Sequence, residues 1–171
     1  MKKIFLTFFF LIFSSILYAQ EKIVYLDTNY LLTQSDVGKY VNSKLKKIND
    51  KNVEEFKKIE LNIKSIEEKL LNQKNILKKD DYEEKVFNLK NKYKSYQEQR
   101  KIKNAELNQL RNEAGNKILN HINEILTKYS KNESISLIIE KKNVVIGKTD
   151  LDVTSDIMSL LNKKIKKIEL Q

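Results

Sequence analysis

Helix-breaking residues are almost absent from this chain. Its 171 residues contain no proline and only three glycines, Gly38, Gly115 and Gly147. Glycine and proline end or kink helices, and a compact α/β enzyme needs many turns that are rich in these residues. The chain is therefore predicted to be mainly α-helical, with long and uninterrupted helices.

Apolar side chains recur along two segments with the three- and four-residue spacing of a coiled-coil seam. The first helix is predicted over residues 36–77, with the seam Val41, Leu45, Ile48, Phe56, Ile59, Ile63, Ile66, Leu70 and Leu77. The returning helix is predicted up to residue 129, with the seam Tyr82, Val86, Leu89, Tyr93, Tyr96, Leu107, Leu110, Ala114, Ile118, Ile122, Ile125 and Tyr129. Residues 36–129 are therefore predicted to form a long antiparallel coiled-coil hairpin, the arm.

Two details of the arm follow from its polar residues. The tip is expected near residues 78–81, where Asp80 or Asp81 can cap the second helix. Arg100 and Lys103 occupy seam positions of that helix, so the middle of the hairpin is expected to be loose or wet.

Short β-prone runs flank the arm at residues 23–26, 135–139 and 144–146, and a last helix is expected from Thr154 or Ser155. Residues 20–35 and 130–171 are thus predicted to form a small α+β body into which the arm is inserted. Three short strands and one helix bury little apolar surface alone, so oligomerisation through the body is expected. The residues expected to build this oligomerisation body are Ile23, Val24, Leu26, Ile135, Leu137, Ile139, Val144 and Ile146.

Residues 1–19 are interpreted as a secretion signal peptide that is cleaved after Ala19. Lys2 and Lys3 precede an apolar run at residues 4–17, which is shorter than the roughly 18–20 residues that span a bilayer. Because Leu17 is large for its place before the cleavage site, an uncleaved anchor is the alternative. Without Lys2 and Lys3, 31 basic and 23 acidic side chains leave a net charge of +8. Outside the cytoplasm this charge favours polypeptides, lipopolysaccharide or anionic lipids over nucleic acid as partners.

With these features in this order, the sequence resembles the Skp/OmpH family over essentially its whole length. The matching segments are the signal peptide, the first strand, the start of the first long helix at residues 31–39, the later strands at 135–140 and 143–146, and the loop at 148–154. The resemblance implies a trimer assembled through the body, whose three arms enclose a cavity. It also implies an ATP-independent holding chaperone of the periplasm that shields unfolded outer-membrane proteins, its clients. The tip differs from that of relatives, because it lacks their small flexible residues.

Candidate client-binding residues lie off the predicted seam or carry the positive charge of the returning helix. They are Leu61, Leu71, Ile76, Phe87, Ile102, Lys90, Lys92, Lys94, Arg100, Lys101 and Lys103. The lysines and the arginine would attract acidic chains, and the apolar side chains would hold unfolded segments by many weak contacts. The alternatives are arm-to-arm packing for the apolar residues and an ordinary solvated coiled-coil surface for the charges.

Other motifs point away from an enzyme. Gly147-Lys148-Thr149 resembles the end of a phosphate-binding loop, but Lys142 stands where that loop needs glycine. His121 is the only histidine and is expected to pack near the base of the arm, without a catalytic partner. No cofactor, catalytic group or metal site is predicted. The rival hypothesis is a structural coiled-coil envelope protein, or a lipopolysaccharide-binding element without chaperone activity.

Overall fold

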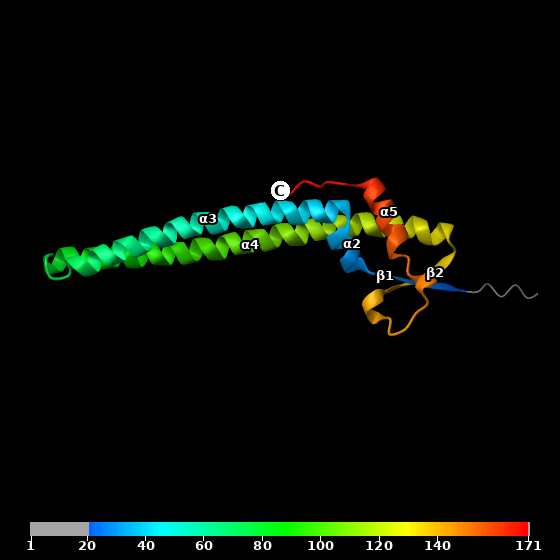
Figure 1. The fold of residues 1–171 in the computed structure, drawn as a ribbon, viewed down its shortest axis with the longest axis horizontal. Coiled ribbons are helices and arrows are strands. Elements are labelled where there is room, and N and C mark those ends of the chain that lie inside the picture. The colour runs from blue at the N-terminus through cyan, green and yellow to red at the C-terminus, as the bar shows by residue number, and fades with distance from the viewer. Residues whose placement is uncertain (1–20, 171) are drawn as a thin grey trace, which may run out of the picture.

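A computed structural model describes residues 21–170 as a long helical arm attached at one end to a small body (Figure 1). The elements follow in the order β1, α2, α3, α4, β2, η1, η2 and α5, where η1 and η2 are single 3-10 turns. The predicted signal peptide and its cleavage site lie outside the described residues.

The arm consists of α3 (Asp36–Gln73) and α4 (Lys79–Asn132), which run side by side and antiparallel (Figure 1). At 1.5 Å per residue, α3 is about 57 Å long and α4 about 81 Å. The hydroxyl of Ser35 caps α3 by accepting a hydrogen bond from the backbone N–H of Gly38 at 3.1 Å. The predicted hairpin, mainly α-helical with a small β-containing body, is confirmed.

The tip of the arm lies at residues 74–78, several residues before its predicted place. The first helix ends at Gln73, whose polar side chain breaks the seam, although Leu77 still fits the heptad spacing. Asp80 and Asp81 do not cap α4. They lie in its first turn, where negative charge is favourable, and Lys78 precedes the helix without a capping side chain.

The body contains a two-stranded parallel sheet of β1 (Lys22–Leu26) and β2 (Ile135–Glu140), in which Val24 lies opposite Ile138. Helix α2 (Thr28–Gln34) follows β1, although the residues Asp27, Thr28 and Asn29 by themselves also suit a turn. Asp27 starts α2 by accepting a hydrogen bond from the N–H of Tyr30 at 2.8 Å. Helix α5 (Thr154–Lys164) begins as predicted and completes the body.

The third predicted strand, at residues 144–146, is not formed within the described part of the chain. After β2 the chain enters the 3-10 turn Lys141–Asn143 (η1), and Lys141 pairs with Asp152 at 2.6 Å. Val145 and Ile146 are 98% and 92% exposed. Since this segment has no neighbouring strand within the described residues, its β-prone side chains alone do not make it a strand.

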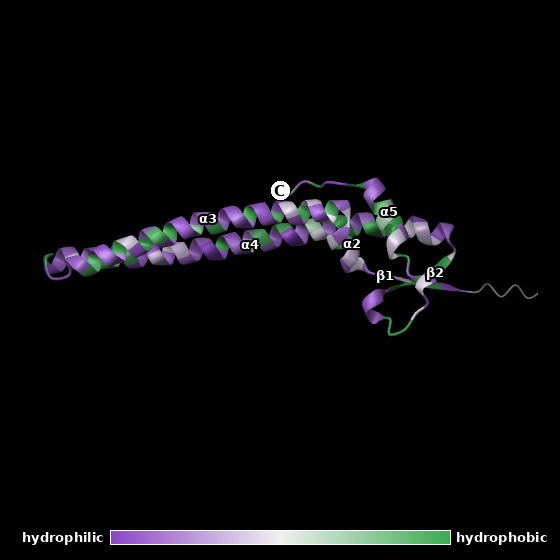
Figure 2. Ribbon diagram, in the orientation of Figure 1, coloured by the Kyte–Doolittle hydropathy of each residue, from purple (hydrophilic) through white to green (hydrophobic). Residues whose placement is uncertain are grey.

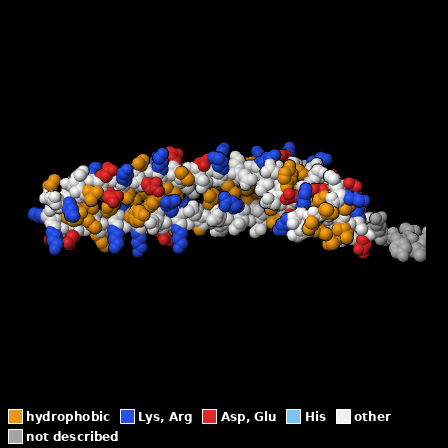
Figure 3. Space-filling view, turned by 60° about the horizontal axis from the view of Figure 1, so that its bottom comes forward, with side chains coloured by type: hydrophobic (Ala, Val, Ile, Leu, Met, Phe, Trp, Pro, Cys, Tyr) orange, Lys and Arg blue, Asp and Glu red, His pale blue; other side chains and the backbone are white. Residues whose placement is uncertain are grey.

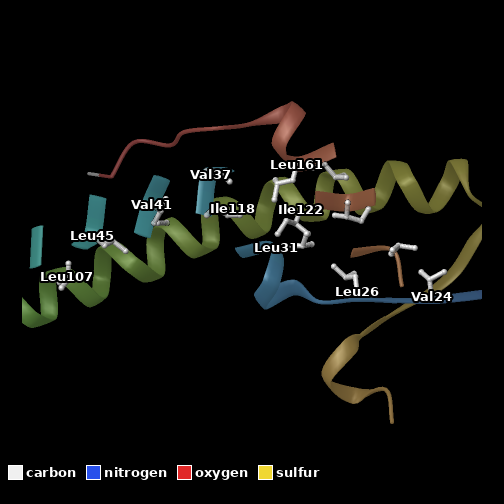
Figure 4. Close-up of a cluster of buried hydrophobic side chains, with 14 residues drawn as sticks. Val24, Leu26, Leu31, Val37, Val41, Leu45, Leu107, Ile118, Ile122 and Leu161 are labelled. Atoms are coloured by element: carbon white, nitrogen blue, oxygen red, sulfur yellow. The ribbon is translucent and has the colours of Figure 1, made fainter. Parts of the chain in front are cut away.

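The hydrophobic core lies where the base of the arm meets the body (Figure 4). Its buried side chains come from β1, α2, α3, α4, α5 and the loop before α5: Val24, Leu26, Leu31, Val37, Val41, Leu45, Leu107, Ala114, Ile118, Ile122, Ile125, Val153, Ile157 and Leu161. Figure 2 shows hydrophobic residues along α4 at this junction and a largely hydrophilic ribbon toward the middle of the arm. Nearer the tip, only Ile63, Leu70 and Tyr96 are buried among the described residues.

Candidate functional site on the arm surface

The five apolar side chains expected off the seam are all exposed on the arm. Their exposed fractions range from 47% for Ile102 to 81% for Ile76, and the set is Leu61, Leu71, Ile76, Phe87 and Ile102. Val53, Val86 and Tyr93 are exposed as well. The heptad pattern places Val86 and Tyr93 in the seam, but a two-helix seam has no third helix to cover its flanks. Sequence spacing alone therefore missed this part of the apolar surface.

Four of the six basic candidates are free of ion pairs within residues 21–170, namely Lys90, Lys92, Lys94 and Lys101. Lys103 differs, because its ammonium group pairs with Glu106 at 2.8 Å, and this hydrogen bond raises the pKa of Lys103. Arg100 lies 3.7 Å from Glu60. The positive charge available to a partner is thus carried mainly by the four unpaired lysines.

Arg100 joins the two helices rather than loosening the seam between them. Its guanidinium lies 5.6 Å from the centre of the Tyr96 ring and 6.0 Å from that of Phe56. It donates a hydrogen bond to the Tyr96 hydroxyl at 3.1 Å, and that hydroxyl donates to Glu60. Burial and the bond to Glu60 raise the pKa of Tyr96. This cluster links the two helices, so the middle of the arm is not loose at Arg100, but it is wet there as the alternative expectation has it, because the Arg100 and Glu60 side chains are each 53% exposed.

The candidate residues do not share one face of the arm. Phe87, Lys94 and Lys101 recur every seven residues and form one stripe of α4. Lys92 lies roughly 140–180° from the members of that stripe around the helix axis, at about 100° per residue. It lines a groove near the tip, together with Lys69 and Lys85, which the sequence did not single out. In the space-filling view, hydrophobic patches alternate with Lys and Arg side chains along the arm (Figure 3).

His121 lies near the base of the arm, and the Gly147-Lys148-Thr149 motif lies in the body. His121 is partly buried beside Glu124, with its Nδ1 atom 4.0 Å from the carboxylate and without a hydrogen bond. Lys148 precedes the single 3-10 turn Thr149–Leu151 (η2), and its carbonyl accepts a hydrogen bond from the Tyr25 hydroxyl at 3.1 Å. Neither residue belongs to a group suited to catalysis. No cluster of three His, Asp or Glu side chains that could hold a metal ion is present in the described part of the chain.

The residues expected in the oligomerisation body divide by exposure. Val24 and Leu26 are buried inside the chain's own core, and Ile135, Ile139 and Val144 are partly buried. The outward apolar surface is formed by the remaining three, Ile23, Leu137 and Ile146, and by the adjoining Val145. One edge of the sheet is occupied, because the N–H of Val153 donates to the carbonyl of Tyr25 at 2.9 Å. The other edge, along β2, has no neighbouring strand within the described residues.

The fold defines a class of protein in which a small α+β body carries a two-helix coiled-coil arm. The surface of this arm is basic and has scattered exposed apolar side chains. The chain belongs to the family of outer membrane proteins described as OmpH-like, whose family model matches residues 22–161. This membership confirms the resemblance found in the sequence. None of the helices within residues 21–170 combines the length and the hydrophobicity that crossing a membrane requires.

A solved structure supports the fold. The chain is similar to the crystal structure of a candidate OmpH-like outer membrane chaperone from Caulobacter crescentus, with a TM-score of 0.80 and 18% sequence identity. The similarity covers 88% of this chain and 89% of the Caulobacter chain. A search of the curated proteins found no match.

Proposed function

We propose that this protein is an ATP-independent holding chaperone of the periplasm, which binds unfolded outer-membrane proteins and prevents their aggregation. The observation that carries the proposal is the arm surface, where exposed apolar side chains stand among lysines without ion pairs. Family membership and the similarity to a candidate outer membrane chaperone support the same role.

The arm surface suits weak and general binding. Leu61, Phe87 and Ile102 are spread along the arm instead of forming one pocket, so an unfolded chain can touch several of them in many arrangements. Each contact removes little apolar area from water and contributes correspondingly little to affinity. The unpaired lysines raise the rate of encounter with acidic segments. Release then follows from the folding of the client into the membrane and needs no nucleotide.

Assembly into a homotrimer through the body completes the proposal. A single arm cannot enclose a client, whereas several arms held together at their bases form a cavity. The free edge of β2 and the exposed Leu137, Val145 and Ile146 offer hydrogen-bonding groups and apolar area for such an interface. Export to the periplasm through the signal peptide at residues 1–19 places the protein where its clients pass. Lipopolysaccharide or an anionic membrane surface is a further partner that the positive charge allows.

The test is aggregation of a client. A urea-unfolded outer-membrane β-barrel is diluted into the purified mature protein without ATP, and light scattering is followed. We expect scattering to fall to the level of the buffer blank at a near-stoichiometric amount of trimer. Unchanged aggregation in the presence of a correctly assembled oligomer would refute the chaperone role, and would favour a structural coiled-coil protein of the envelope.

A further inference from the structure

A groove of about 440 Å³ lies between α3 and α4 close to the tip. Three of its lining residues are apolar, three are lysines and two are amides, and none is a carboxylic acid. The set is Ile66, Leu70, Leu89, Lys69, Lys85, Lys92, Gln73 and Asn88. The groove therefore combines apolar side chains with three lysines, the rim lysines, and no carboxylate, and one of these lysines, Lys92, donates a hydrogen bond to Asn62.

The three rim charges have the same sign and surround one groove. Lys85 and Lys92 are seven residues apart on one stripe of α4, and Lys69 faces the same groove from α3. Like charges that meet across two paired helices destabilise them. Some lysines of α3 pair with a carboxylate one turn away, as Lys58 does with Glu54 at 3.1 Å, but the three rim lysines form no ion pair in residues 21–170. Residues that lower stability in this way are typical of binding sites.

We propose that this groove is a subsite for a client segment in which an apolar side chain stands next to Asp or Glu. This inference rests on the proposed chaperone function and specifies part of its substrate. The apolar side chain covers Ile66, Leu70 and Leu89, and the carboxylate lies among the three ammonium groups.

The amides select a peptide over an anionic lipid. Gln73 and Asn88 each carry both hydrogen-bond donors and an acceptor. An unfolded peptide has free backbone N–H and C=O groups that need such partners once they leave water. A lipid phosphate would use mainly the amide donors, whereas a peptide backbone can use both the donors and the acceptors of these two exposed side chains.

The experiment uses the full mature protein and two triple variants of equal charge. The groove variant is Lys69→Gln, Lys85→Gln and Lys92→Gln. The control variant is Lys47→Gln, Lys57→Gln and Lys64→Gln, three exposed lysines of α3 that do not line this groove and form no ion pair within the described residues. Binding of a fluorescein-labelled, unstructured peptide with repeated Leu-Asp pairs is measured by anisotropy at low salt, beside a peptide with Lys in place of Asp.

We expect the groove variant to bind the Leu-Asp peptide about tenfold more weakly, while the control variant stays within about twofold of the unmodified protein. The Lys-containing peptide should bind no variant measurably. The thermal midpoint of the groove variant should equal or exceed that of the unmodified protein, because the repulsion is relieved. A weaker peptide affinity together with a raised thermal midpoint would show that the variant has lost the binding site and not the fold.

Three results would overturn the inference. Equal weakening by both variants would mean that the overall field of the arm, and not the groove, attracts the peptide. Unchanged peptide binding together with lost binding to phosphatidylglycerol vesicles would assign the groove to an anionic lipid. Suppressed barrel aggregation with peptide binding alike in all three proteins would leave the chaperone function standing without this subsite. If the unmodified protein fails to suppress aggregation, it is the chaperone proposal that falls.

Discussion

Two glycines of this chain occupy opposite environments, although both lie in helices. A β-carbon at Gly38 would lie 2.2 Å from the carbonyl oxygen of Leu32, because α3 starts directly after α2 and packs against its end. A β-carbon at Gly115, inside α4, would have no atom within 4 Å. The first glycine is required by a close approach of two backbones, and the second only adds flexibility to the unfolded chain.

Alanine substitutions at these two positions should therefore act in opposite directions. Gly38→Ala should lower the free energy of unfolding by about 1–3 kcal/mol, since the backbone around Leu32 must move. Gly115→Ala should raise it by about 1 kcal/mol through helix propensity. Urea unfolding followed by circular dichroism measures both, and the two variants control for each other. A Gly38→Ala protein as stable as the unmodified one would contradict the close approach.

The roles of single charged residues could be predicted only in part from the sequence. Arg100 was recognised as a seam interruption, but its contacts with Glu60 and Phe56 depend on the register between the two helices. The heptad pattern of one helix does not specify how that helix is aligned along its partner. For the same reason Lys69 and Lys85 were missed: each helix shows its own stripes, and only the paired structure shows which stripes face the same groove.

At the scale of elements, the long helices were predictable because their seams repeat many times. The incorrect predictions concern elements that are too short to show a periodic pattern. Helix α2 has seven residues, fewer than a periodic pattern needs, and Asp27 suits a turn as well as a helix start. The β-prone residues 144–146 were predicted as a strand, but strand formation depends on a neighbour that a single chain does not supply.

The arm itself should be unevenly stable along its length. Its base shares the continuous core, from Leu45 and Leu107 to Ile125, while the part nearer the tip buries only Ile63, Leu70 and Tyr96. Local opening is easiest where few apolar contacts hold a segment. Hydrogen–deuterium exchange followed by mass spectrometry should show faster exchange in residues 61–92 than in residues 107–125. Equal protection along both segments would contradict this gradient.

At the scale of the whole molecule, substitutions in the exposed loop after β2 can test whether the chain assembles through its body. Val145 and Ile146 are almost fully exposed in the single chain, so charges there should leave the fold of one subunit intact. Val145→Asp with Ile146→Asp should reduce the proposed trimer to smaller species, because charges would be buried at the interface. Analytical ultracentrifugation measures the mass. Ile76→Asp, an exposed position at the tip, is the control that should keep the oligomer.

The parallel pairing of β1 with β2 also determines the order in which the chain can fold. The two strands are neighbours in the sheet, yet the entire arm separates them in the sequence. Closing so long a flexible loop is entropically unfavourable, and contacts between distant segments form slowly. Pairing of α3 with α4 removes most of this loss, since it brings the end of α4 back beside the start of α3. The arm is therefore expected to form before the sheet, because β1 can pair with β2 only once the chain has been made as far as residue 140.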